Sequence, residues 1–147
     1  MTRHRSLGWD EITVPTELAE VVDEISYRRV VMNPGATWDY FPGHYDPHYA
    51  ESQGQPTIFV NTMHLAGFVD RIATDWAGPY SRVVRRKLSI TGSIYAGDAM
   101  VGRGRVVDKR CDDAGAAPRY LVDLEIAIVN QRDELCCPAQ VTLQLPG

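Results

Sequence analysis

The side chains best suited to proton transfer lie in one segment, residues 36–56, which is also rich in aromatic residues and proline. It contains Asp39 and, five positions later, His44. A carboxylate and an imidazole can exchange the roles of acid and base when their surroundings hold both pKa values near the working pH. The alternative is structural, because Asp and His are common in loops and could cap the turn before Pro47.

Other polar residues nearby have simpler interpretations. Asp46 precedes Pro47, so we expect it to cap a short helix and not to act in catalysis. His48 is expected on the solvent side of that helix, and His64 on a helix surface or at a contact between subunits.

The elements around this segment are predicted from hydrophobic periodicity. Residues 26–32 are predicted to form a first strand, ended by the turn sequence Asn33-Pro34-Gly35. After the segment, Thr57 can cap a long, largely buried helix that begins at Ile58 and stops before Gly78-Pro79. Gly67 inside this helix either indicates the close approach of another backbone or is incidental. At the amino-terminal end, four apolar residues are expected to pack onto the domain: Trp9, Ile12, Val14 and Leu18.

The rest of the chain is predicted to be strand. Four strands are expected, at residues 82–90, 99–107, 120–129 and 135–145. Consecutive strands with short links form an antiparallel sheet, because parallel neighbours need long crossovers. One early strand, one long helix and four later strands therefore predict an α+β domain in which the sheet curls around the helix.

Length and composition narrow the function. With 147 residues, the chain is expected to form a single domain over 1–147. An apolar fraction of 44% with 23% charged residues is ordinary for a soluble globular protein. No apolar run is long enough to span a membrane, and no hydrophobic region follows residues 1–6. We therefore expect a cytoplasmic protein.

Charge and cysteine content exclude further classes. A net charge of -4 opposes binding to nucleic acid, because attraction to phosphate dominates that affinity. The three cysteines, Cys111, Cys136 and Cys137, do not form the pattern of a disulfide framework. Cysteine and histidine also lack the spacing of zinc ligands, so the sequence predicts no metal site.

A local basic run stands out against this acidic background. It could bind the phosphates of a small anionic ligand, or it could form a solvated strand face. Its members are Arg82, Arg85, Arg86 and Lys87.

The segment around Asp39 and His44 resembles the motif of the MaoC-like hydratases and dehydratases. That motif reads Asp, any residue, Asn, Pro, an aliphatic residue, His, any residue, Asp and, shortly afterwards, Ala. The matching positions of this sequence are Asp39, Pro42, His44, Asp46 and Ala50. The resemblance covers roughly residues 36–145 and implies a hotdog fold, in which an antiparallel sheet wraps one long central helix.

The resemblance also implies the chemistry. Asp39 and His44 would be the catalytic pair of an enoyl-CoA hydratase, converging on one water that adds to C3 of a 2-enoyl thioester while C2 receives a proton. The sequence does not decide which of the two removes the first proton. A backbone N–H early in the helix would stabilise the thioester oxygen, and matching the helix start places it at Asn61. The basic run would bind coenzyme A.

Two positions depart from the motif. Phe41 replaces its Asn and Gly43 its aliphatic residue, which implies a reshaped pocket for a wider or flatter acyl group. The string Ile58-Phe59-Val60-Asn61 and the later Asp75-Trp76-Ala77-Gly78-Pro79 resemble the small MaoC-like subunits of actinobacterial steroid side-chain degradation, which suggests a steroid acyl group.

Members of this family pair two hotdog domains, so a homodimer or a heteromer with a second MaoC-like chain is expected. Two alternatives stay open. One is an acyl-CoA thioesterase on the same fold, and the other is a non-catalytic subunit that binds acyl-CoA or completes a partner's tunnel.

Overall fold

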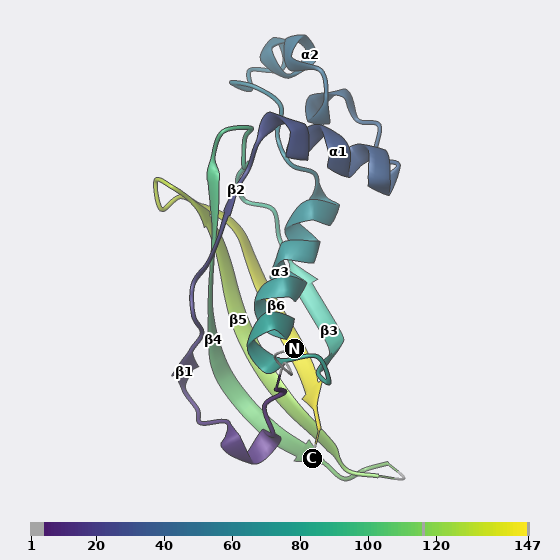
Figure 1. Ribbon diagram of the computed structural model, residues 1–147, viewed down its shortest axis with the longest axis vertical. Coiled ribbons are helices and arrows are strands. Elements are labelled where there is room, and N and C mark those ends of the chain that lie inside the picture. Colours follow the sequence, from purple (N-terminus) through teal and green to yellow (C-terminus); the bar gives the residue numbers. More distant parts are fainter. Residues whose placement is uncertain (1–4, 116, 147) are drawn as a thin grey trace.

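A curved antiparallel sheet wraps around a long helix, α3, in the computed structural model, which describes residues 5–115 and 117–146 (Figure 1). Two further helices, α1 and α2, lie beyond one end of the sheet (Figure 1). The strands are β1 (Thr16–Glu17), β2 (Val21–Glu24), β3 (Arg82–Leu88), β4 (Ala99–Asp112), β5 (Arg119–Asn130) and β6 (Leu135–Leu145). The helices are α1 (Tyr27–Thr37), α2 (Pro47–Ser52) and α3 (Thr62–Ala77), with short 3-10 helices at η1 (Trp9–Glu11) and η2 (Pro42–His44).

The strand order is β1-β4-β5-β6-β3, and β2 also pairs with β4. All of these pairs are antiparallel. The predicted hotdog arrangement, an α+β fold with the sheet around a central helix, is therefore confirmed. The four late strands are found where the sequence predicted them, although β4 extends five residues further than expected, to Asp112.

The inner face of the sheet and α3 form one hydrophobic core. Val122, Leu124, Ile126 and Ile128 of β5 are all buried, as their alternation with polar residues predicts. The helix lies very close to β4 at Gly102, where an added Cβ would come within 2.2 Å of the Cδ1 of Ile72. This position therefore needs glycine because of the helix–sheet distance.

The prediction of a strand at residues 26–32 is wrong, because this segment forms most of α1. Ser26 caps the helix by accepting a hydrogen bond from the Arg29 N–H at 3.2 Å. Val30 and Pro34, four residues apart, form its buried side. The expected turn at Asn33-Pro34-Gly35 lies inside the helix, which ends instead at Trp38 in the left-handed conformation, with φ 59°.

The start of the long helix is also corrected. The helix begins at Thr62, not Ile58, because the residues before it take part in sheet-like contacts. Phe59 forms a bridge with Tyr95, and the Val60 N–H donates to the Ile94 carbonyl at 2.9 Å. Gly67 has no backbone close by, since an added Cβ would meet nothing within 4 Å.

At the amino-terminal end, Ile12 and Leu18 are buried and Trp9 packs against the core, as expected. Val14 is instead 43% exposed. Of the residues 1–6 used to predict the cellular location, positions 1–4 lie outside the described residues. Among the described residues, no helix combines the length and apolar composition needed to cross a lipid bilayer.

Candidate active site

His44 is held rigidly at the end of η2. Its Nδ1 lies 2.8 Å from the Phe59 carbonyl oxygen. Because a carbonyl can only accept, Nδ1 carries the proton and Nε2 is left with its lone pair in the neutral ring. The rings of Phe41 and Phe59 pack edge-on against the imidazole, with centroids at 5.4 and 5.0 Å. The side chain is only 9% exposed, so its orientation is fixed by contacts on several sides.

Asp39 is placed beside His44 by the end of α1. After the left-handed Trp38, the Asp39 N–H returns to the Pro34 carbonyl at 3.1 Å. One carboxylate oxygen, Oδ2, then lies 3.5 Å from Nε2 of His44. The Asp39 side chain is 37% exposed, so the carboxylate meets solvent while the imidazole is mostly enclosed.

This geometry can bind one water between two acceptors. Oδ2 of Asp39 and the Nε2 lone pair of His44 face the same region, and each can accept a proton from a shared water. Such a water keeps its oxygen lone pairs free for attack on an electrophilic carbon. The arrangement therefore suits general acid–base chemistry on an added water molecule.

Asn61 forms the N-cap of α3 and is buried. Its Oδ1 accepts from the His64 N–H at 2.9 Å, and its Nδ2 donates to Oγ1 of Thr37 at 2.9 Å. The N–H groups at the start of a helix have no intrahelical acceptor, and the N–H of Asn61 makes no backbone hydrogen bond with another described residue. Asn61 lies two residues after Phe59, whose carbonyl holds His44, so this donor belongs to the same end of the fold.

The four cations of the basic run are not brought together. The run forms the edge strand β3, where Arg82, Arg85 and Lys87 pair with Gln144, Thr142 and Gln140 on the outer face of the sheet. Arg86 lies on the inner face instead, where it donates to the Ala66 carbonyl at 3.3 Å and pairs with Asp70 of α3.

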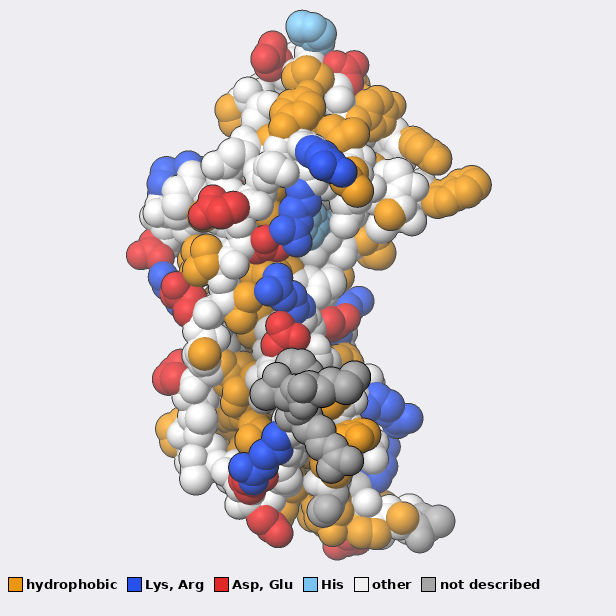
Figure 2. Space-filling model, viewed as in Figure 1, with side chains coloured by type: hydrophobic (Ala, Val, Ile, Leu, Met, Phe, Trp, Pro, Cys, Tyr) orange, Lys and Arg blue, Asp and Glu red, His pale blue; other side chains and the backbone are white. Residues whose placement is uncertain are grey.

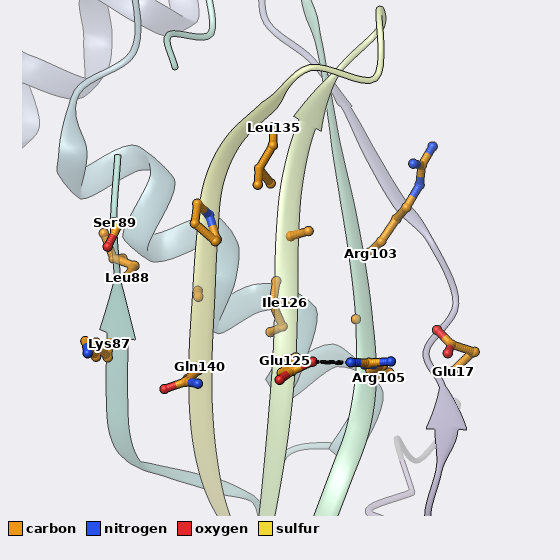
Figure 3. Close-up of a pocket in the computed structure, with 14 residues that line it drawn as sticks. Glu17, Lys87, Leu88, Ser89, Arg103, Arg105, Glu125, Ile126, Leu135 and Gln140 are labelled. Carbon is orange, nitrogen blue, oxygen red and sulfur yellow. Dashed lines mark hydrogen bonds and ion pairs between the residues drawn. The ribbon is translucent and has the colours of Figure 1, made fainter. Parts of the chain in front are cut away.

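A shallow hollow on the outer face of the sheet lies beside these cations (Figure 3). Lys87, Gln140, Glu125 and Arg105 lie across it, one from each of the four strands β3, β6, β5 and β4. Arg105 and Glu125 pair with each other at 2.5 Å. The hollow contains neither Asp39 nor His44.

Two predictions for nearby residues are confirmed. Asp46 caps α2 by accepting from the N–H groups of His48 and Tyr49, at 3.0 and 3.2 Å, and His48 is exposed. The prediction for His64 is wrong, because this residue is buried against α1 and only 9% exposed. No sequence signal identified the Phe59 carbonyl as the partner of His44, since any residue could supply it.

Metal-ligating side chains do not cluster in the part of the chain that the structure describes: no three of His, Cys, Asp or Glu come together. The cysteines of this part are free, Cys111 exposed and Cys136 and Cys137 buried.

Comparison with known families gives the context for this site. A family model described as "MaoC like domain" matches residues 16–118, a span that includes Asp39, His44 and Asn61. The chain belongs to the MaoC-like family. Its dyad and helix cap thus lie inside the part of a MaoC-like protein that the family model covers.

Individual MaoC-like relatives are also similar. The beta subunit of 3-oxo-4,17-pregnadiene-20-carboxyl-CoA hydratase from Mycobacterium tuberculosis is 36% identical over 77 residues, which is 52% of this chain. The match spans 60% of that subunit's own length. The ChsH1-ChsH2 complex from the same organism contains a chain with a TM-score of 0.81 and 28% identity, covering 91% of this chain and 98% of that one.

A third similarity concerns the fold alone. The (R)-hydratase of A. caviae involved in PHA biosynthesis superposes with a TM-score of 0.80 at 21% identity, over 92% of this chain and 98% of that one. These comparisons agree with the hotdog topology described above.

Proposed function

We propose that this chain is the catalytic subunit of an enoyl-CoA hydratase. The observation that carries the proposal is the 3.5 Å approach of Asp39 to His44 within a MaoC-like domain. The water bound by this pair adds through its oxygen to C3 of a 2-enoyl-CoA and gives up one proton to the pair. The pair returns one proton to C2, so the sum of the steps is the addition of one water.

The N-terminus of α3 stabilises the charge that develops during this reaction. Addition at C3 places negative charge on the thioester oxygen, and a backbone donor aimed at that oxygen lowers the barrier. We assign this role to the N–H of Asn61, which is supported by its position at the cap of α3 and by the partial positive charge of a helix N-terminus.

The acyl group that we propose is a steroid side chain. Support comes from the similarity to the pregnadiene carboxyl-CoA hydratase subunit and from the exposed surface around Asp39. Trp38, Tyr40 and Phe41 are 80%, 62% and 44% exposed. Figure 2 shows hydrophobic side chains gathered at the end of the molecule that carries α1 and α2. Such a surface suits a broad apolar group.

A second MaoC-like chain is the partner that we propose, as a homodimer or heteromer. β3 is an edge strand with one side unpaired in the described sheet, and an unpaired edge can pair with a strand of another chain. A similar chain is part of the ChsH1-ChsH2 complex, and this similarity supports the heteromer. The cytoplasmic location stays a prediction.

Hydration of crotonyl-CoA by the chain copurified with its native partner tests the function. We expect Asp39→Asn and His44→Gln each to lower kcat by about a hundredfold or more, because each removes one of the two proton-transfer groups. Asp108→Asn and His48→Gln change exposed residues of the same types and should leave kcat unchanged.

The same assay separates the rival functions. Unchanged hydration in the Asp39→Asn complex would assign catalysis to the partner and make this chain non-catalytic. Release of free thiol from a saturated acyl-CoA, without hydration of the enoyl-CoA, would indicate a thioesterase. A panel that adds a steroidal enoyl-CoA tests the acyl group, which is supported if this substrate has the highest kcat/KM.

A further inference from the structure

One buried side chain joins the start of α3 to the end of α1. Asn61 is only 1% exposed, and its Nδ2 donates to Oγ1 of Thr37 at 2.9 Å. The Thr37 hydroxyl in turn donates to the Asn33 carbonyl of α1, also at 2.9 Å. Hydrogen bonds connected in this way polarise and strengthen one another. The last turn of α1 is therefore joined to the residue whose N–H we assign to the thioester oxygen.

Thr37 lies two residues before Asp39, whose carboxylate is placed mainly by its own backbone. Among the described residues, the only polar partner of this carboxylate is His44, with Oδ2 and Nε2 at 3.5 Å. The backbone that carries it is held by two N–H groups, those of Trp38 and Asp39, which both donate to the Pro34 carbonyl. The position of the carboxylate therefore follows the position of the end of α1.

The residue between Thr37 and Asp39 is in an unfavourable conformation. Trp38 has a φ of 59°, in the left-handed region that a Cβ disfavours. Its side chain is 80% exposed, so packing within the chain does not hold it there. Such a backbone persists only where the surrounding structure fixes it from several sides. Here the hydrogen bonds to Pro34 and those of the Thr37 hydroxyl do so. Without the hydroxyl, the turn can relax and displace Asp39.

His44 is bound to the same segment of chain by separate hydrogen bonds. Its Nδ1 lies 2.8 Å from the Phe59 carbonyl oxygen, and the Phe59 N–H donates to the carbonyl of the residue before His44 at 3.2 Å. Asn61, which holds Thr37, follows Phe59 by two residues. Residues 59–61 therefore hold both members of the acid–base pair, one through a main chain and the other through a side chain.

We propose that Thr37 is a positioning residue for the hydration reaction. Its hydroxyl, bound by the Asn61 side chain, holds Asp39 at the distance from His44 and from the Asn61 N–H that the reaction needs. The inference rests on the proposed function for the reaction, whereas the hydrogen bonds of Thr37 do not depend on that function. A displacement of about 1 Å can slow an enzyme by about a hundredfold, so a smaller shift of Asp39 should lower kcat by about tenfold.

Three variants of the copurified complex, assayed with crotonyl-CoA, test this role. Thr37→Val keeps the shape of the side chain and removes the hydroxyl, so kcat should fall by about tenfold while KM changes by less than about twofold. Thr37→Ser keeps the hydroxyl and should retain kcat within about twofold. Thr74→Val is the matched control, because Thr74 of α3 also donates to the carbonyl four residues earlier, at 2.8 Å, but lies outside the site. It should leave kcat unchanged.

Asn61→Ser separates the bond to Thr37 from the cap of α3. Serine still caps the helix, because its hydroxyl can accept from the His64 N–H, but it has no amide group to donate to Thr37. Asn61→Ser and Thr37→Val should each lower kcat by about tenfold, and the double variant should be no slower than either single variant. Losses that multiply in the double variant would mean that the two residues act separately, which overturns the proposal.

NMR order parameters test the position of Asp39 without any turnover. The backbone ¹⁵N order parameter of Asp39 should be about 0.85 in the unchanged protein, in Thr37→Ser and in Thr74→Val, and should fall toward about 0.6 in Thr37→Val. A general loss of structure in Thr37→Val would lower the order parameters of β5 as well, whereas loss of positioning is confined to the end of α1.

The two proposals fail in different ways. Unaltered kcat in Thr37→Val, in an assay where Asp39→Asn is slow, overturns the role of Thr37 and leaves the proposed function intact. If the unchanged complex hydrates no enoyl-CoA, the proposed function fails and the order parameter decides alone. A fall at Asp39 in Thr37→Val then supports positioning through Thr37, and an unaltered value overturns it.

Discussion

Nε2 of His44 faces Oδ2 of Asp39 at 3.5 Å, while Nδ1 of the same ring lies 2.8 Å from the carbonyl oxygen of Phe59. The carbonyl fixes the tautomer, because it can only accept. We therefore predict that ¹⁵N NMR of the neutral protein shows His44 protonated at Nδ1, whereas the exposed His48 samples both tautomers. A neutral His44 protonated at Nε2 would contradict the shared-water geometry.

The N–H of Asn61 can be tested apart from its side chain. Asn61→Ala removes the cap of α3 and should reduce the free energy of unfolding by about 1 kcal/mol, but it keeps the N–H. Asn61→Pro also removes the N–H, and the φ of -84° at this position is close to the value that proline adopts. We expect kcat of Asn61→Pro to be about a hundredfold below that of Asn61→Ala. Equal kcat values in the two variants would exclude this donor.

Gly43 and Phe41 depart from the family motif together, and the structure explains why. A Cβ on residue 43 would come within 2.6 Å of Cε1 of Phe41 and 3.0 Å of the Phe59 ring. Gly43→Ala should therefore lower the free energy of unfolding by about 1–3 kcal/mol. In a Phe41→Asn background, the same change should be less destabilising, as a double-mutant cycle measured by urea denaturation would show. Additive effects would mean that the two positions are independent.

His64 should make stability depend on pH. Burial, with a smaller effect of Arg29, lowers its pKa in the folded protein below the usual 6.5, although Asp23 acts in the opposite direction. Between these two pKa values the unfolded chain binds more protons, so the free energy of unfolding falls as pH decreases through 6.5. His64→Gln should remove this part of the slope in urea titrations at a series of pH values. His48→Gln is the control, and an identical slope in His64→Gln would contradict the prediction.

The regular part of the fold could be predicted because its periodicity comes from burial. Val122 to Ile128 alternate because one face of β5 packs on α3, and the apolar spacing of α3 has the same cause. Residues 26–32 were predicted incorrectly because β-branched and aromatic residues favour strands, whereas Ser26 and the buried pair Val30 and Pro34 make the segment a helix. The start of α3 was placed too early because Ile58 is apolar, although it belongs to a sheet-like segment.

The site was only partly predictable for a different reason. Asp39 and His44 stand in a short local motif, so the family resemblance indicated them, and the structure brings them close together. The partner of His44 is the main-chain carbonyl of Phe59. Every residue type carries such a carbonyl, so the sequence could not indicate it. The basic run on β3 is local in sequence but not in space, because neighbours along a strand point to opposite faces.

The segment from α1 to α2 carries Asp39 and His44 outside the sheet, and it is joined to the rest of the protein by the buried Val30 and Ala50 and by hydrogen bonds that include Thr37–Asn61 and His44–Phe59. The proton-transfer pair and the strands of the sheet thus come from separate stretches of chain. An engineer could exchange residues 26–56 for the equivalent insert of another hotdog protein, keep both anchoring bonds, and change the preferred thioester without redesigning a single strand.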